Sequence, residues 1–93
     1  MTKSELIERL SEADGSLSRN EAEAVVNGII DAMIQALQGG ERVEIRGLGS
    51  FTVRERKARV ARNPKTGDTV EIPARKIPFF KTGKELRERV NNL

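Results

Sequence analysis

Cysteine, histidine, tryptophan and tyrosine are all absent from this 93-residue sequence, and phenylalanine occurs three times. The lack of cysteine excludes disulfides, and the lack of both cysteine and histidine argues against a zinc site. Enzymes commonly use these side chains as nucleophiles or general bases, and no glycine-rich phosphate loop joins a predicted strand to a helix. We therefore expect a protein that is not an enzyme, with no catalytic residues, metal, cofactor or small-molecule substrate.

Long hydrophobic runs are absent as well. No stretch approaches the about 20 apolar residues of a membrane span, and the first residues contain no signal-peptide hydrophobic region. The expectation is a soluble cytoplasmic protein with no membrane partner. A chain of 93 residues forms one domain at most. Because so small a core is only marginally stable alone, an oligomer is favoured.

The overall net charge of +3 hides an uneven distribution along the chain. Residues 1–40 carry three basic and seven acidic side chains, whereas residues 41–93 carry fourteen basic and seven acidic ones. Residues 54–76 alone have eight basic and three acidic side chains, a net charge of +5. This asymmetry indicates a polyanionic partner such as nucleic acid, although a solvated basic face without a ligand would have the same charge.

Two helices are predicted in residues 1–40. Each opens with a capping box, in which a hydroxyl and a glutamate satisfy two backbone amides reciprocally: Thr2 with Glu5, and Ser18 with Glu21. Gly15 is expected to end the first helix in a left-handed conformation.

The second helix, which Gly39-Gly40 would end, has a broad apolar stripe. Its members are Ala22, Val25, Val26, Ile29, Ile30, Met33, Ile34 and Leu37. Two alternatives would cover this stripe: the chain's own sheet, or a second chain across a two-fold axis. The small core favours the dimer.

The second half predicts strands, and the whole chain an α+β fold. Residues 41–46 alternate apolar and charged side chains, as a strand with one wet face does, and Gly47-Leu48-Gly49 predicts a tight reversal. Residues 50–60 and 69–78 predict the two sides of a long two-stranded ribbon, basic on both faces and with nothing apolar to pack on.

Pro73 and Pro78 cannot donate a ladder hydrogen bond, so we expect them at an edge or a bulge. A third capping box, Thr82 with Glu85, predicts the start of a short C-terminal helix. The phenylalanines are interpreted as core residues rather than a stacking platform for RNA bases: Phe51, Phe79 and Phe80.

Residues 63–67, Asn-Pro-Lys-Thr-Gly, form a turn signal at the end of the basic ribbon. The turn would present Pro64 as a rigid apolar group, and such groups serve as wedges between base steps of the minor groove. Basic side chains along the ribbon would neutralise phosphates and release counterions: Arg54, Arg56, Lys57, Arg59, Arg62, Lys65, Arg75 and Lys76.

These patterns resemble the bacterial HU and integration host factor family, itself an example of minor-groove wedge proteins. The resemblance covers the whole chain, and residues 1–10 and 41–47 are most similar to the beta-subunit type. One departure is Leu48, where the family usually has phenylalanine; a core role is expected to survive it. The residues that carry the resemblance are Gly47, Leu48, Gly49, Ser50, Phe51, Arg56, Arg59, residues 62–67, Phe79, Lys81, Gly83, Lys84 and Leu86.

The resemblance implies an intertwined dimer, either a homodimer or a heterodimer with a related alpha-type subunit, that bends double-stranded DNA. It implies a single domain with a helical dimerisation part (1–40), a sheet with a DNA-binding arm (41–81) and a C-terminal helix (82–93). It also implies proline intercalation from each arm, and roles in recombination, transcription and organisation of the nucleoid.

Residue by residue, the resemblance makes Pro64 the wedge and assigns the remaining contacts to two sets. Tip residues that shape the turn and contact the minor groove are Arg62, Asn63, Lys65 and Gly67. Body residues that reach the groove or phosphates are Arg42, Glu44, Arg46, Lys3, Lys81, Lys84 and Arg87. On a strand, Arg42, Glu44 and Arg46 would share the wet face, where the carboxylate can hold a guanidinium in one pose.

Two other functions remain open. An HU-like homodimer would bind DNA with little sequence preference, and the Glu44–Arg46 pattern favours the sequence-selective type over it. A protein–protein interaction module could use the same basic ribbon to grip an acidic partner.

Overall fold

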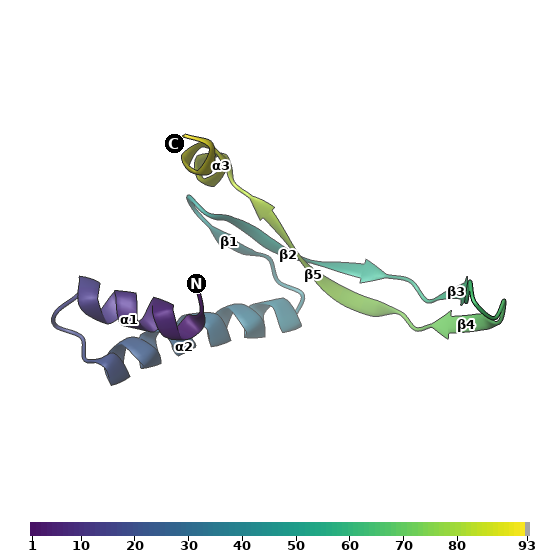
Figure 1. The fold of residues 1–93 in the computed structure, drawn as a ribbon, viewed down its shortest axis with the longest axis horizontal. Coiled ribbons are helices and arrows are strands. Elements are labelled where there is room, and N and C mark those ends of the chain that lie inside the picture. The colour runs from purple at the N-terminus through teal and green to yellow at the C-terminus, as the bar shows by residue number, and fades with distance from the viewer. Residues whose placement is uncertain (93) are drawn as a thin grey trace. The chain divides into compact units, whose positions relative to one another are not determined.

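A computed structural model describes residues 1–92 of the chain and has the predicted α+β composition (Figure 1). The chain divides into two compact units, one ending at Ala36 and the other beginning at Leu37. The first unit contains helix α1 (Lys3–Ala13) and most of helix α2 (Arg19–Gln38). The second contains strands β1 (Val43–Ile45), β2 (Gly49–Arg56), β3 (Arg59–Arg62), β4 (Thr69–Ile72) and β5 (Arg75–Thr82), and helix α3 (Lys84–Asn91).

Helix α1 begins at the predicted Thr2 cap, with one of the two expected capping-box bonds among the described residues, and it ends differently. The Thr2 hydroxyl accepts a hydrogen bond from the Glu5 amide, 3.2 Å away. The C-cap is Asp14 in an extended conformation, and Gly15 does not adopt positive φ, so the predicted glycine cap is wrong. The physical reason is the Asp14 carboxylate, which accepts hydrogen bonds from the Ser16 amide at 3.0 Å and hydroxyl at 2.6 Å. These bonds form an Asx turn, which ends the helix without a glycine in the left-handed conformation.

The capping box of helix α2 is confirmed in both directions. The Ser18 amide donates to Glu21 Oε1 at 3.1 Å, and the Glu21 amide donates to Ser18 Oγ at 3.1 Å. The helix stops where predicted, because Gly40 turns to a φ of +79° and its amide bonds back to the Leu37 carbonyl.

The hydrophobic core of the first unit is small. Ile7 of α1 and Ala22 and Val26 of α2 are buried, with Leu10 and Ile30 packed against them. The rest of the α2 stripe includes Val25, Ile29 and Ile34, which are 42%, 56% and 47% exposed. Helix α1 therefore covers one edge of the stripe and leaves most of it in contact with solvent.

Strands β1, β2 and β5 form an antiparallel sheet in the order β1-β2-β5, and β3 and β4 form a separate two-stranded ribbon. The expected continuous ribbon is thus interrupted: pairing stops after the Arg56–Arg75 pair and resumes at the Arg59–Ile72 pair. Pro73 lies in this interruption, and Pro78 lies on β5, an edge strand, as predicted. Proline in the interruption leaves no amide to continue the ladder. We call residues 57–74 the arm.

Helix α3 lacks the predicted threonine cap. Thr82 still belongs to β5, where it pairs with Gly49, and the N-cap is Gly83, which offers no side chain. The Gly83 amide instead donates to the Leu48 carbonyl at 3.0 Å and ties the start of α3 to the β1–β2 turn. Leu93, which the sequence placed in this helix, lies outside the described residues. None of the described helices is long and apolar enough to cross a membrane.

Candidate nucleic-acid interface

The register of β2 and β5 separates the sheet into two chemically different faces. Residues directly opposite each other share a face, and successive residues alternate. One face carries the pairs Phe51–Phe80 and Val53–Pro78, together with Val43 and Ile45 of β1; we call it the apolar face. The other carries the pairs Ser50–Lys81, Thr52–Phe79, Arg54–Ile77 and Arg56–Arg75; we call it the basic face.

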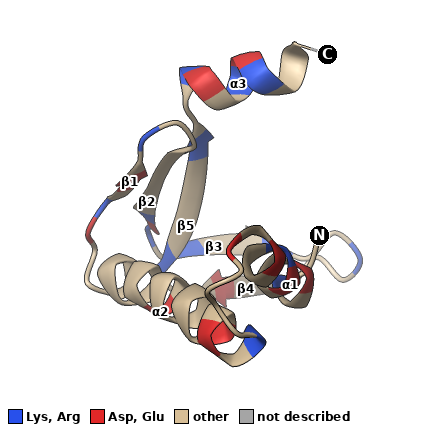
Figure 2. Ribbon diagram, turned by 90° about the vertical axis from the view of Figure 1, so that its left-hand side faces the viewer, with Lys and Arg blue, Asp and Glu red and all other residues tan. Residues whose placement is uncertain are grey.

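The expectation of a ribbon basic on both faces holds in the arm, where Arg59 and Arg62 lie on opposite faces, but the charge is uneven within the sheet. Within the sheet, Arg54, Arg56, Arg75 and Lys81 all fall on the basic face. Lys76 falls on the opposite face, directly across from Glu55. Basic residues of this unit are blue in Figure 2. The positive charge of the paired strands is therefore concentrated on one side of the sheet.

The apolar face contains two of the three phenylalanines. The Phe51 and Phe80 rings lie 4.6 Å apart, centroid to centroid, and are tilted by 45°. Phe80 is nevertheless 38% exposed and Leu48 in the adjoining turn is also 38% exposed, so neither belongs to a core within this chain. The expected core roles of Phe80 and Leu48 are not met by the single chain, because nothing in the second unit is packed over this face densely enough to bury it.

Phe79 lies on the basic face, where the sequence interpretation had placed no aromatic ring. The guanidinium carbon of Arg54 lies 3.6 Å from the centroid of the Phe79 ring. Its interpretation as a core residue is wrong, since the ring is 39% exposed. The register explains the contact: Phe79 pairs with Thr52, which places it diagonally beside Arg54 on the same face.

Glu44 contacts Arg42 and not Arg46 among the described residues. Arg42 Nη2 lies 3.7 Å from Glu44 Oε1 and donates a hydrogen bond of 3.1 Å to Ser50 Oγ. Arg46 lies outside β1, because the Leu48 amide closes a turn onto the Ile45 carbonyl at 3.0 Å. The expectation of three side chains along one strand is therefore wrong, because Arg42 precedes β1 and Arg46 follows it, exposed in the turn.

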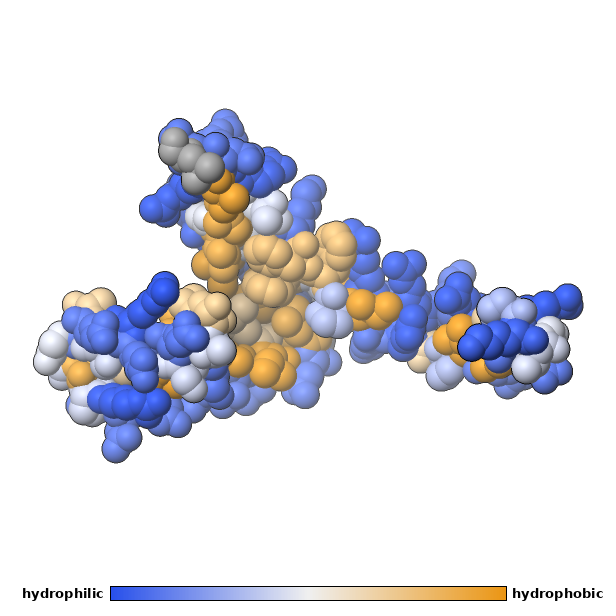
Figure 3. Space-filling model, in the orientation of Figure 1, coloured by the Kyte–Doolittle hydropathy of each residue, from blue (hydrophilic) through white to orange (hydrophobic). Residues whose placement is uncertain are grey.

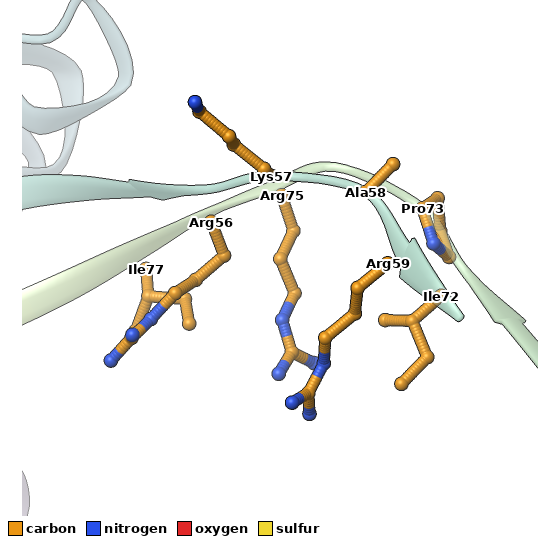
Figure 4. Close-up of a pocket in the computed structure, with 8 residues that line it drawn as sticks. All are labelled: Arg56, Lys57, Ala58, Arg59, Ile72, Pro73, Arg75 and Ile77. Carbon is orange, nitrogen blue, oxygen red and sulfur yellow. The ribbon is translucent and has the colours of Figure 1, made fainter. Parts of the chain in front are cut away.

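The interruption of the ladder is lined by arginines from both strands (Figure 4). Arg56, Arg59 and Arg75 extend to the same side of the backbone in this view, while Lys57 extends to the opposite side. Ile72 and Ile77 lie beside the arginines and give the hollow an apolar wall. Among residues 1–92, no ion pair involves these arginines.

The arm beyond the interruption is mostly hydrophilic, with hydrophobic patches (Figure 3). Val60 pairs with Glu71 and is 66% exposed, and Val70 pairs with Ala61 and is 49% exposed. Each face of the arm therefore carries an exposed valine.

The tip of the arm is a closed, hydrogen-bonded turn. The Gly67 amide donates to the Asn63 carbonyl at 2.8 Å, and the Asn63 amide donates to the Asp68 carbonyl at 2.8 Å. The Asn63 side chain also takes part, because its Oδ1 accepts from the Lys65 amide at 2.9 Å. Gly67 has a φ of +75°, which a residue with a Cβ rarely adopts. Pro64 is exposed at this tip.

The remaining predicted site residues lie outside the arm. Lys3, in the first unit, donates a hydrogen bond of 2.9 Å to Asn27 Oδ1. Lys84 lies 3.8 Å from Glu88 on the exposed side of α3, and Arg87 is exposed on the same helix. Sequence reasoning missed three partners of the basic residues, Asn27, Ser50 and Phe79. Strand register would have revealed Phe79, but nothing in the sequence links Asn27 to Lys3.

Comparison with known proteins gives one consistent result. Residues 1–91 match the family model described as bacterial DNA-binding protein. The integration host factor subunit beta of Tolumonas auensis is 55% identical over 93 residues, which cover all of both chains. That of Vibrio cholerae is 57% identical over 91 residues, which cover 98% of this chain and 99% of the relative.

Solved structures agree. A cocrystal structure of Anabaena HU with DNA has a TM-score of 0.85 and 42% identity, with full coverage of both chains. HU from Thermotoga maritima has a TM-score of 0.68 and 28% identity, with coverage of 98% of this chain and 100% of that one.

The fold, with its basic sheet face and arm, defines a DNA-binding architectural protein. The chain belongs to the bacterial DNA-binding protein family, which contains HU and integration host factor, and it is similar over its full length to integration host factor beta subunits. The predicted family and fold are thus confirmed.

Proposed function

We propose that this protein binds duplex DNA as a dimer, lays its arm along the minor groove and bends the duplex by inserting Pro64 between two base pairs. The observation that carries the proposal is the tip geometry: Pro64 is exposed at the end of a basic arm, in a turn closed by the Asn63–Gly67 and Asn63–Lys65 hydrogen bonds.

The closed turn is important because Pro64 must keep its position when it is pushed between two base pairs. Proline has a fixed φ and no side-chain rotamers to lose, so insertion costs it little conformational entropy. In minor-groove benders, a group that includes this family, unstacking costs a few kcal/mol per step and is offset by the contacts that bent DNA makes. Asn63 and Gly67 serve the turn itself, and Arg62 and Lys65 flank it as candidate groove contacts.

The basic face and the arm supply the side chains that neutralise DNA phosphates. Because Arg54, Arg56, Arg75 and Lys81 share one face of the sheet, they can meet one phosphate backbone together. Arg59 continues this series across the interruption (Figure 4). Further phosphate contacts are proposed for basic residues that lie on other surfaces or bond to neighbouring side chains: Lys57, Lys76, Lys3, Lys84 and Arg87.

Dimer formation is supported by two uncovered hydrophobic surfaces. The α2 stripe and the apolar face both expose side chains that a folded protein normally buries: Val25, Ile29, Ile34 and Phe80. A second chain, either identical or a related alpha-type subunit, would cover them. The relatives' name, subunit beta, agrees with the heterodimer for those proteins.

Sequence selection would be mostly indirect, through DNA that kinks easily or has a narrow minor groove. Arg46 is exposed in the β1–β2 turn, free to enter a narrow groove, and Glu44 of β1 pairs with Arg42, which precedes the strand. Recombination, transcription and nucleoid organisation in the cytoplasm are the roles proposed for such an architectural protein.

A salt titration on duplex DNA tests this proposal. A DNA-binding arm predicts that log affinity falls linearly with log salt, with a slope that reports several phosphates. Bending is then compared on a random duplex and on one that carries an A-tract. Equal binding and bending of both duplexes would favour the HU-like type with little sequence preference. Salt-insensitive or absent binding to duplex DNA would overturn the proposal in favour of a protein partner.

A further inference from the structure

The Phe79 ring is the one aromatic side chain that the register places on the basic face among the described residues. It pairs with Thr52 and is flanked along β5 by Ile77 and Lys81, which share its face. At 39% exposure the ring is not a buried core residue, and the apolar face on the other side of the sheet already has Phe51 and Phe80. Core packing therefore does not explain why the Phe79 ring lies among basic side chains.

Arg54 gives that explanation. Its guanidinium carbon is 3.6 Å from the ring centroid, well inside the about 6 Å within which a cation is attracted to an aromatic face. A guanidinium that stacks flat on a ring still has its five N–H donors in the plane, directed outward. Among residues 1–92, no carboxylate or hydrogen-bond acceptor is paired with these donors. The guanidinium over the ring therefore remains available to an anion.

We propose that Phe79 is a positioning residue for DNA binding: its ring holds the Arg54 guanidinium flat on the basic face, so that the outward N–H groups meet a DNA phosphate already oriented. A long arginine side chain loses rotamer entropy when it is immobilised on binding, and an interaction made before binding reduces that loss. This inference rests on the proposed function of the basic face and adds to it the role of a residue that carries no charge.

Three substitutions separate this role from the alternatives. Phe79→Leu keeps an apolar side chain and removes the aromatic face, whereas Phe79→Tyr keeps the face. Arg54→Ala removes the cation. If Phe79 merely packs against the strand, leucine and tyrosine should behave alike toward DNA. If Phe79 contacts DNA by itself, its loss should matter equally with or without Arg54.

The first measurement concerns the free protein and needs no DNA. The Arg54 Nε–H proton, observed by NMR, is expected to be shifted by the ring current of Phe79. The shift should persist in Phe79→Tyr and disappear in Phe79→Leu, with thermal unfolding used to confirm that each variant is folded.

The second measurement is a double-mutant cycle on duplex affinity at fixed salt. Phe79→Leu is expected to weaken binding about 2- to 5-fold, the range for an exposed cation–π contact, and Phe79→Tyr to leave it unchanged. In the Arg54→Ala background, Phe79→Leu should have no further effect.

The outcomes distinguish this inference from the function it rests on. An unchanged affinity in Phe79→Leu, or an equal loss in both backgrounds, overturns the positioning role while salt-dependent binding of the unsubstituted protein leaves the DNA-binding function intact. Failure of the unsubstituted protein to bind duplex DNA removes the proposed function itself, whatever the NMR shift shows.

Discussion

Arg56 on β2 lies directly opposite Arg75 on β5, in the last pair before the ladder is interrupted. Like charges directly opposite each other destabilise an antiparallel pair. The sheet thus ends in an unfavourable pair of cations, and Arg59, just across the interruption, extends to the same side of the backbone as both (Figure 4). A phosphate group placed among these guanidiniums would relieve the repulsion. Binding of a polyanion at this place is therefore favoured electrostatically.

The adjacent residues Arg75 and Lys76 offer a matched pair for testing the two faces. Arg75→Gln should reduce the slope of log affinity against log salt by about one for each arm that makes the contact. Lys76→Gln removes the same charge from the opposite face, where the side chain lies across from Glu55, and should change the slope less. Equal changes in slope for the two variants would contradict the concentration of phosphate contacts on the basic face.

Arg46 is exposed in the turn after β1, and its role is proposed to be groove recognition. Arg46→Ala should therefore weaken binding to an A-tract duplex more than binding to a random duplex. Competition between the two duplexes at one salt concentration measures the ratio directly. An unaltered ratio with lower affinity for both would make Arg46 an ordinary phosphate contact.

The exposed stripe of α2 predicts that a charge placed there disrupts assembly. Ile29 is 56% exposed in the single chain, so Ile29→Asp should leave the fold of the first unit intact and shift the molecular mass in solution toward the monomer. Gln35→Asp places the same charge on the opposite side of α2, by helical periodicity, and should leave the mass unchanged. A dimer that survives Ile29→Asp at micromolar concentration would remove α2 from the interface.

The capping box of α2 predicts a dependence of stability on pH. The hydrogen bond from the Ser18 amide, followed by that with the Ser18 side chain, lowers the pKa of Glu21 from its ordinary value of 4.5. A carboxylate whose folded-state pKa is lowered stabilises the fold above its unfolded pKa, and this contribution is lost as the pH falls through the folded value.

Glu21→Gln should therefore lower the free energy of unfolding near neutral pH, and its difference from the unsubstituted protein should shrink below the ordinary pKa. Chemical denaturation at a fixed protein concentration and several pH values measures this. Asp14, whose pKa is lowered by the Ser16 hydroxyl and amide, contributes a similar dependence that the substitution leaves in place. A difference that stays constant with pH would contradict the role of the Glu21 carboxylate.

The sequence predicted the local structure well where one side chain decides the outcome. The Thr2 cap, the capping box at Ser18, the turn at residues 47–49 and the edge position of Pro78 follow from hydroxyls, glycines and a missing amide. It failed where a second interaction competes for the same residue, as at Asp14, whose carboxylate bonds to Ser16, so that Asp14 and not Gly15 is the cap. Thr82 failed for the same kind of reason, since pairing with Gly49 retained it in β5.

The sequence predicted which residue types make up the site, but not how they are arranged in space. Counting charges indicated a basic arm, but which cations share a face depends on a register that sequence alone does not determine. The stacking of Arg54 on Phe79 follows from that register, and Arg46 falls outside the strand because β1 ends at Ile45. The apolar stripe of α2 could be read from the sequence. What covers it could not, because we propose that the covering surface belongs to a second chain.

Bending by Pro64 is the central claim, and the bend angle of a duplex labelled at both ends, measured by fluorescence transfer, tests it most directly. Pro64→Ala keeps the hydrogen bonds that close the turn, which involve Asn63, Lys65, Gly67 and Asp68, so the arm should retain its shape. The account predicts that the bound duplex is distinctly less bent with Pro64→Ala, while the salt dependence of binding is retained. An unchanged bend angle in a complex that is fully formed would contradict it.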